Sequence, residues 1–206
     1  MNRDADLCAA AAHNNALWCD AMARIHGAAS TFVAGAWLNR RPAPRFHPNL
    51  VTLGDPRERH AHLYAVRQLQ ATPPAPGWAV KDSFASLDLA PLGFELLFEA
   101  SWIYRPAGAF DRIDSDYRAR RIASEDALHA WEEAWRAGAL EQRERLFRPE
   151  LLDEETHAVI ALQHKLAIVA GCIASQTGWR CPDSPTCSRH RTMTAGCECH
   201  AWLPHR

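Results

Sequence analysis

The densest group of side chains that could do chemistry lies at the end of the chain, in residues 180–206. Thiols and imidazoles bind zinc, and the candidates here are Cys181, Cys187, His190, Cys197, Cys199, His200 and His205. Zinc sites usually separate paired cysteines by about two to four residues, so that one turn supplies two ligands. Cys181 and Cys187 stand further apart than this, whereas Cys197 and Cys199 stand closer together. We therefore predict no metal site.

A second candidate group is basic and lies in a loop rich in proline. Its members are Arg40, Arg41, Arg45 and His47, and the same segment contains Pro42, Pro44 and Pro48. Guanidinium groups bind carboxylates and phosphates, so the loop could hold an acidic substrate or a phosphate. A solvated loop stiffened by its prolines explains the same residues more simply, and that is the role we predict.

Two further pairs have the residue types of a catalytic or metal site. His60 and His62 are two residues apart on an expected helix, which turns them to different sides and argues against a shared metal site. For both we favour the interpretation that the imidazole faces solvent. Glu95 and Glu99 are an even number of positions apart on an expected strand and therefore project from one face. One of them could act as a general base, but a solvated sheet face is the favoured interpretation.

The cysteines before the tail are isolated from one another. Cys8, Cys19 and Cys172 each stand beside apolar residues, and we predict that they are buried free thiols. A nucleophilic role for Cys19 has no supporting partner, and no G-x-S-x-G motif accompanies the serines. The catalytic and cofactor-binding residues are therefore unknown at this stage.

Composition excludes several function classes. The net charge is -1 and the isoelectric point about 6.8, with no basic stripe, which argues against a nucleic-acid partner. No apolar run approaches a membrane span, and the start of the chain lacks an export-signal pattern, so we expect no membrane partner and a cytoplasmic location. The expected partners are a small-molecule amine or a protein.

Hydrophobic patterns divide the chain into four parts. We predict a first unit at 1–105, a linker at 106–116, a second unit at 117–179 and a disordered tail rich in Cys and His at 180–206. In the first unit we expect a helix from Asn14 or Asn15 to a stop at Gly27, then short strands at 31–33, 36–38 and 50–53. A second helix should follow, capped by Asp55 and ending near Leu69, and then strands at 78–84 and 94–104, the latter with one core face.

The second unit shows the order strand, helix, short helix and hairpin. A strand is expected at 117–122, and a helix capped by Ser124 should run to Gly138. Less regular helix continues to Leu146, and Pro149 opens a single turn. An antiparallel hairpin is expected from 156–162 and 166–175, and its last strand would leave an edge open to self-association. The fold class is therefore α+β, with two small, mostly antiparallel sheets flanked by helices and an irregular C-terminal tail.

This second order resembles the opening of the GNAT superfamily of acetyltransferases. The segments that carry the resemblance are 120–122, Ala130-Trp131-Glu132-Glu133-Ala134-Trp135, 146–149 and 168–174. The first unit looks like a degenerate copy of the same fold, on segments 14–20, 37–42, 48–53 and 81–102. The resemblance implies that a fourth strand and its following helix bind acetyl-CoA through a loop of the pattern Gln/Arg-x-x-Gly-x-Gly/Ala.

The sequence departs from that pattern at the loop itself. Nothing from Gly178 onward matches the loop, and in the first unit the equivalent turn places Asp55 and Glu58 where phosphate oxygens would sit. The expected function is an acetyl-CoA-dependent N-acetyltransferase-like protein of unknown amine substrate, truncated or frameshifted and without bound acetyl-CoA. The alternative is a non-catalytic ligand- or protein-binding module. For the tail, out-of-frame translation, an ordinary disordered tail and an unusual metal or redox tail are the three interpretations.

Overall fold

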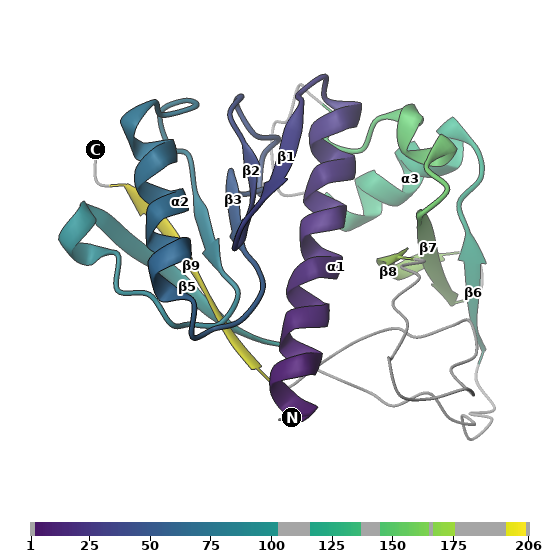
Figure 1. Cartoon of the computed structure of the whole chain (residues 1–206). Helices are drawn as coiled ribbons and strands as arrows, with labels where there is room; N and C mark the ends of the chain where they lie inside the picture. Colours follow the sequence, from purple (N-terminus) through teal and green to yellow (C-terminus); the bar gives the residue numbers. More distant parts are fainter. Residues whose placement is uncertain (1–2, 103–115, 137–144, 165–166, 176–196, 205–206) are drawn as a thin grey trace. The chain divides into compact units, whose positions relative to one another are not determined.

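The computed structural model describes residues 3–102, 116–136, 145–164, 167–175 and 197–204 (Figure 1). The chain has an α+β fold, as predicted, and divides into two compact units. The first unit comprises residues 1–106 and 193–206, and the second comprises residues 107–192. None of the helices in the described ranges is both long enough and apolar enough to cross a membrane.

The first unit is built on a six-stranded sheet with the strand order β1-β2-β3-β4-β9-β5. Its elements are α1 (Arg3–Ile25), β1 (Ser30–Val33), β2 (Ala36–Asn39), β3 (Leu50–Thr52), α2 (Arg59–Ala71), β4 (Val80–Asp82), η1 (Ala90–Leu92), β5 (Phe94–Trp102) and β9 (Cys197–Pro204). All neighbouring strands are antiparallel except β3 and β4, which are parallel and joined through α2. The expected strands at 31–33, 36–38 and 50–53 are thus confirmed.

The sheet of the first unit is covered on both faces, because side chains alternate along its strands. Leu38 of β2 packs in a cluster that includes Val66 and Leu69 of α2, on one face of the sheet. Trp37, the neighbouring residue, packs in a second cluster with alanines of α1 and with Val51. Helix α1 therefore covers one face and α2 the other (Figure 1).

Helix α1 begins at Arg3, well before the predicted start at Asn14 or Asn15. The run of alanines at 9–12 has the highest intrinsic helix propensity, and Asp4 and Asp6 favour the positive end of the helix. The predicted end is confirmed, since α1 ends at Ile25 and Gly27, two residues later, adopts a left-handed backbone with a φ of 76°. The early start lengthens the surface that α1 offers to the sheet.

Strand β5 does not have the core face that its alternation predicts. Phe94 is buried, but Leu96, Leu97 and Phe98 are 41%, 45% and 60% exposed. β5 is the last strand of the sheet, and the cluster beneath α2 includes only its first residue. A register shift between Leu96 and Phe98 also interrupts the alternation.

The second unit contains a three-stranded antiparallel sheet with the order β6-β7-β8. Its elements are β6 (Tyr117–Arg121), α3 (Glu125–Arg136), η2 (Pro149–Asp153), β7 (His157–His164) and β8 (Ala167–Ser175). The predicted strand, helix, turn and hairpin are confirmed in that order. Ser124 caps α3 as expected, because its Oγ accepts a hydrogen bond from the backbone N–H of Ala127 at 3.3 Å.

The irregular tail expected at 180–206 contains regular structure at its end. Cys197–Pro204 forms strand β9, which lies between β4 and β5 and is antiparallel to both. Two flanking strands satisfy the backbone of β9 on both sides, so the strand does not require an apolar sequence. Residues 180–196 and the linker at 106–115 lie outside the described residues.

Candidate functional site

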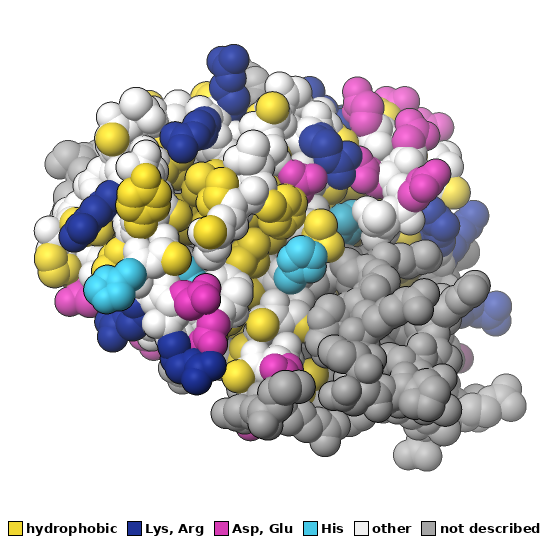
Figure 2. Space-filling model, in the orientation of Figure 1, with side chains coloured by type: hydrophobic (Ala, Val, Ile, Leu, Met, Phe, Trp, Pro, Cys, Tyr) yellow, Lys and Arg dark blue, Asp and Glu magenta, His cyan; other side chains and the backbone are white. Residues whose placement is uncertain are grey.

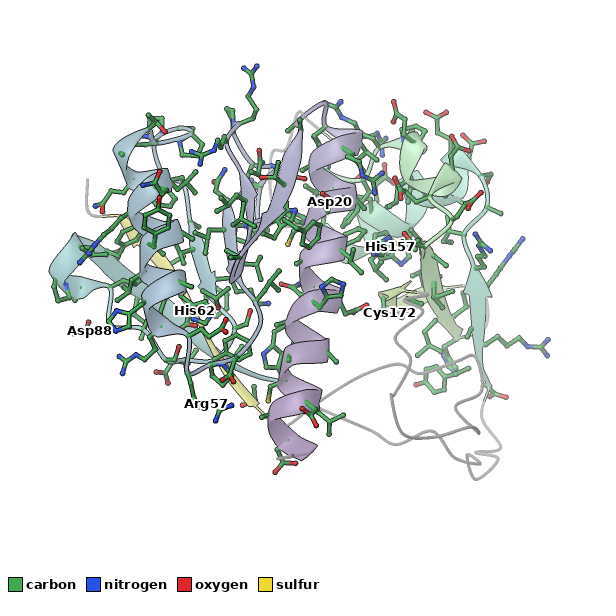
Figure 3. The ribbon with its side chains drawn as sticks, in the orientation of Figure 1. Asp20, Arg57, His62, Asp88, His157 and Cys172 are labelled. Atoms are coloured by element: carbon green, nitrogen blue, oxygen red, sulfur yellow. The ribbon has the colours of Figure 1, made fainter. Side chains whose placement is uncertain are left out.

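The turn from β3 into α2 is where the sequence places the equivalent of an acetyl-CoA loop. The carboxyl ends of parallel strands and the start of the connecting helix are common ligand sites, because free N–H groups point outward there. In this chain the turn comprises Leu53, Gly54, Asp55, Pro56, Arg57 and Glu58. Arg57 is labelled in Figure 3.

Asp55 occupies this turn with its own carboxylate. Asp55 Oδ1 accepts a hydrogen bond from the Arg57 backbone N–H at 2.8 Å, and Asp55 Oδ2 lies 2.6 Å from Arg57 Nη2. Hydrogen bonds from the Arg57 side chain lower the pKa of Asp55 to about 2. The turn therefore holds an ionised carboxylate that is paired with the Arg57 guanidinium and already occupies the Arg57 backbone N–H, a donor that a phosphate would need.

The cap of α2 differs from the prediction. The helix begins at Arg59, and its N-cap residue is Glu58, which makes no capping hydrogen bond with its side chain. Asp55 instead closes the turn before the helix, since its carbonyl oxygen accepts a hydrogen bond from Glu58 N–H at 2.9 Å. The Glu58 carboxylate lies over Gly54, with Oε2 3.5 Å from the position that a Cβ would occupy. Both acidic groups thus remain at the turn, although Asp55 is not the cap.

His62 is buried, so the prediction that it faces solvent is wrong, whereas His60 is exposed as expected. His62 Nε2 donates to the carbonyl oxygen of Leu53 at 2.8 Å, and its ring stacks on Phe84 with 5.8 Å between centroids. Among the described residues, His62 Nδ1 has no hydrogen-bond partner. The imidazole of His62 (labelled in Figure 3) therefore links α2 to the residue that follows β3 by a hydrogen bond.

A buried carboxylate lies at the carboxyl end of β4 and was not predicted. Asp82 Oδ1 accepts hydrogen bonds from Thr52 Oγ1 at 3.1 Å and Phe84 N–H at 3.3 Å. Asp82 Oδ2 accepts from the N–H groups of Ser86 at 2.6 Å and Leu87 at 2.8 Å. All four donors are directed at one carboxylate, so it organises the loop after β4 and has no free lone pair suited to a proton transfer. The polar run Lys81-Asp82-Ser83 after an apolar residue was the signal available in the sequence.

Lys81 of β4 and Cys19 of α1 interact electrostatically. Lys81 Nζ lies 4.3 Å from the centre of the Trp102 ring, a cation–π contact. Burial raises the pKa of the Cys19 thiol to about 12, and the positive charge of Lys81 opposes that rise. Cys19 is thus a buried free thiol, as predicted, and it is not a nucleophile at neutral pH.

The other predicted cysteines and carboxylates behave differently. Cys8 is disulfide-bonded and Cys172 is exposed, so neither is the buried free thiol that was predicted. Glu95 and Glu99 are both exposed, but a register shift lies between them, so they do not project from one face as predicted. Their partners on β9 are an odd number of positions apart, which places the two carboxylates on opposite faces.

The side chains of the candidate zinc ligands in the tail lie outside the described residues. Among the residues that the structure describes, no group of three or more His, Cys, Asp or Glu side chains could hold a metal ion. Comparisons of the chain with protein-family models, curated proteins and solved structures found no match.

Proposed function

We propose that this chain is a GNAT-like protein, related to acetyl-CoA-dependent N-acetyltransferases of unknown amine substrate, and that it is catalytically incomplete. Kinship is supported by the order of elements in both units. In the first unit, a helix is followed by the β1–β2 hairpin, a further strand and then α2. In the second, a strand, a helix, a short helical turn and the β7–β8 hairpin follow one another.

The incompleteness is carried by one observation, the ionised carboxylate at the turn into α2. Asp55 accepts the Arg57 N–H and keeps its charge through the Arg57 side chain. A pyrophosphate at this position would find the Arg57 N–H taken by Asp55 and would meet the Glu58 carboxylate over Gly54. Nearby, His62 Nε2 and the Asp82 carboxylate are occupied by structural hydrogen bonds.

The alternative function is a non-catalytic ligand- or protein-binding module, which the same observations also favour over a working enzyme. A cytoplasmic location is part of the proposal, and the disulfide at Cys8 is the observation that opposes it, since such bonds are rare in reducing compartments. Out-of-frame translation of the tail receives less support at 197–204, because β9 pairs with strands on both of its sides.

The experiment is a calorimetric titration of acetyl-CoA into the wild-type chain and into D55N/E58Q. We expect no saturable binding to the wild type below about 1 mM, and measurable binding once the two carboxylates are neutralised. The control is D126N/E155Q, which makes the same charge change at exposed positions of the second unit. Micromolar binding to the wild type would contradict the incomplete site. Equal behaviour of the two double variants would remove the support for a degenerate acetyl-CoA site.

A further inference from the structure

The β2–β3 loop and the segments around it form a stretch of the chain without acidic residues. No Asp or Glu occurs between Asp20 and Asp55, although this stretch contains Arg24, Arg40, Arg41 and Arg45. Both flanking carboxylates are already engaged, since Asp20 accepts hydrogen bonds from Ser30, Trp37 and Arg24, and Asp55 binds Arg57. Arg24 is thus paired with Asp20, whereas the stretch contains no carboxylate of its own for Arg40, Arg41 and Arg45.

Three guanidinium groups of the loop project from the surface. Arg40, Arg41 and Arg45 are exposed, and no ion pair in the described part of the chain involves them. Lys and Arg side chains (dark blue) stand out along the upper edge of the first unit in Figure 2. Burial lowers the pKa of His47, and a hydrogen bond to the carbonyl oxygen of Arg45 opposes that shift.

The loop is held in one conformation by hydrogen bonds at its base. Asn49 Nδ2 donates to the carbonyl oxygens of Asn39 at 3.0 Å and Arg41 at 2.8 Å. The Arg41 N–H donates to Asn39 Oδ1 at 2.9 Å, and the His47 N–H donates to the carbonyl oxygen of Pro44 at 3.0 Å. A preorganised loop loses little conformational entropy when it binds a ligand.

One donor at the base of the loop is unused. Asn39 is fully buried, and its Nδ2 has no hydrogen-bond partner within the described part of the chain, even though Oδ1 of the same amide accepts from the Arg41 N–H. Buried amide donors are nearly always paired, so this donor is available to an acceptor that reaches the base of the loop.

An aromatic ring stands next to these charges. Phe46 is 63% exposed and has a φ of 66°, a left-handed backbone that bulky residues rarely adopt. The guanidinium of Arg45 lies over its ring, 4.8 Å from the centroid. Backbone strain that holds an apolar ring in water is typical of ligand-binding positions.

We propose that the loop at 40–47 binds a ligand that carries a phosphate monoester beside an aromatic ring. Arg40, Arg41 and Arg45 supply charge-assisted and bidentate hydrogen bonds to phosphate oxygens, and Asn39 Nδ2 supplies a neutral donor. The exposed Phe46 ring contacts the aromatic part of the ligand. A nucleotide and a phosphorylated tyrosine share this chemistry. The site lies at the opposite end of β3 from the turn at Asp55, and the proposal is independent of any acetyl-CoA site.

The experiment measures binding of phenyl phosphate and of inorganic phosphate to the full chain by calorimetry at low salt. We expect saturable binding with a 1:1 ratio, and phenyl phosphate should bind about five- to tenfold more tightly than inorganic phosphate because it stacks on Phe46. R41Q/R45Q should weaken both about 100-fold, from two lost charge-assisted contacts, while F46S should remove only the difference between the two probes. AMP and phosphotyrosine are titrated in parallel, and the tighter of the two shows whether the natural ligand is a nucleotide or a phosphorylated tyrosine.

The matched controls are R67Q and R59Q/R67Q, which remove exposed arginines of α2 away from the loop. These controls should bind both probes as the wild type does. If they weaken binding as much as R41Q/R45Q, the effect is one of net charge and the site is refuted. Absence of binding up to about 10 mM refutes it as well, and equal affinity for the two probes refutes the role of Phe46. Unchanged thermal melting of every variant is required for the comparison, and all substituted side chains are exposed.

Discussion

Replacing Asp82 by asparagine tests whether this carboxylate holds the loop after β4 in place. Asp82 is fully buried, and each of its two oxygens accepts hydrogen bonds from two donors. An asparagine of the same shape keeps one oxygen and presents an NH₂ group to the other pair of donors. The amide will turn its NH₂ toward Thr52, because that hydroxyl can rotate, whereas the N–H groups of Ser86 and Leu87 cannot.

The cost follows from the donors that remain unpaired. In the favoured orientation Phe84 N–H loses its acceptor, and the two bonds to Ser86 and Leu87 lose the strength that a charged acceptor gives. An unpaired buried donor costs about 1–3 kcal/mol, and the weaker acceptor adds to that, so D82N should destabilise the first unit by about 3 kcal/mol. That is a large fraction of the roughly 5–15 kcal/mol that stabilises a typical domain.

Urea denaturation followed by tryptophan fluorescence measures this cost, because Trp37 and Trp78 are buried in the first unit. The control is D88N, since Asp88 is exposed and accepts a single bond from the Ala90 N–H at 3.2 Å. D88N should cost less than about 0.5 kcal/mol. A double-mutant cycle with T52V should show coupling of about 1 kcal/mol, because the two side chains share a hydrogen bond. If D82N costs no more than D88N, the proposed role of the carboxylate is wrong.

Three other predictions concern single groups and one strand. The carboxyl pKa of Asp55, followed by carbon NMR, should lie near 2 and rise toward 3.8 in R57A. The stabilisation of the folded state by this ionised carboxylate is present above the unfolded pKa and is lost as the pH falls through 2. An unchanged pKa in R57A would refute the Arg57 hydrogen bonds as the cause of the low value. Iodoacetamide at pH 8 should modify Cys172 within minutes and leave Cys19 intact in the native protein, as read by peptide mass spectrometry, because Cys19 is buried with a pKa of about 12. Removal of 197–206 should expose the edges of β4 and β5 and make the chain aggregate, as measured by light scattering, whereas a monomer of unchanged melting temperature would show that β9 is dispensable.

The features predicted correctly from the sequence are those fixed by nearby residues. The β1–β2 hairpin follows from Gly35, which takes a φ of 75° in the turn, and the start of α3 follows from the hydroxyl of Ser124. Each of these signals acts within a few residues of the position it determines. The end of α1 at Gly27 belongs to the same class.

The burial of His62 was missed although the sequence carried a signal. His62 lies three, four and seven positions before Ala65, Val66 and Leu69, which are the other buried residues of α2. Helical periodicity therefore places it on the core face, and its polar character led to the opposite prediction. The Leu53 carbonyl, which makes the buried imidazole tolerable, belongs to a different element and gives no local signal.

The errors at β5 and β9 have a common physical origin in long-range pairing. The alternation of β5 is broken at Leu97 because the two strands pair with a register shift, and such a shift depends on the partner strand. That partner, β9, comes from the far end of the sequence. A strand inserted between two others has both rows of backbone groups satisfied, so it can form with few of the apolar residues by which strands are recognised. Composition alone therefore predicted an irregular tail where the sheet of the first unit gains a strand.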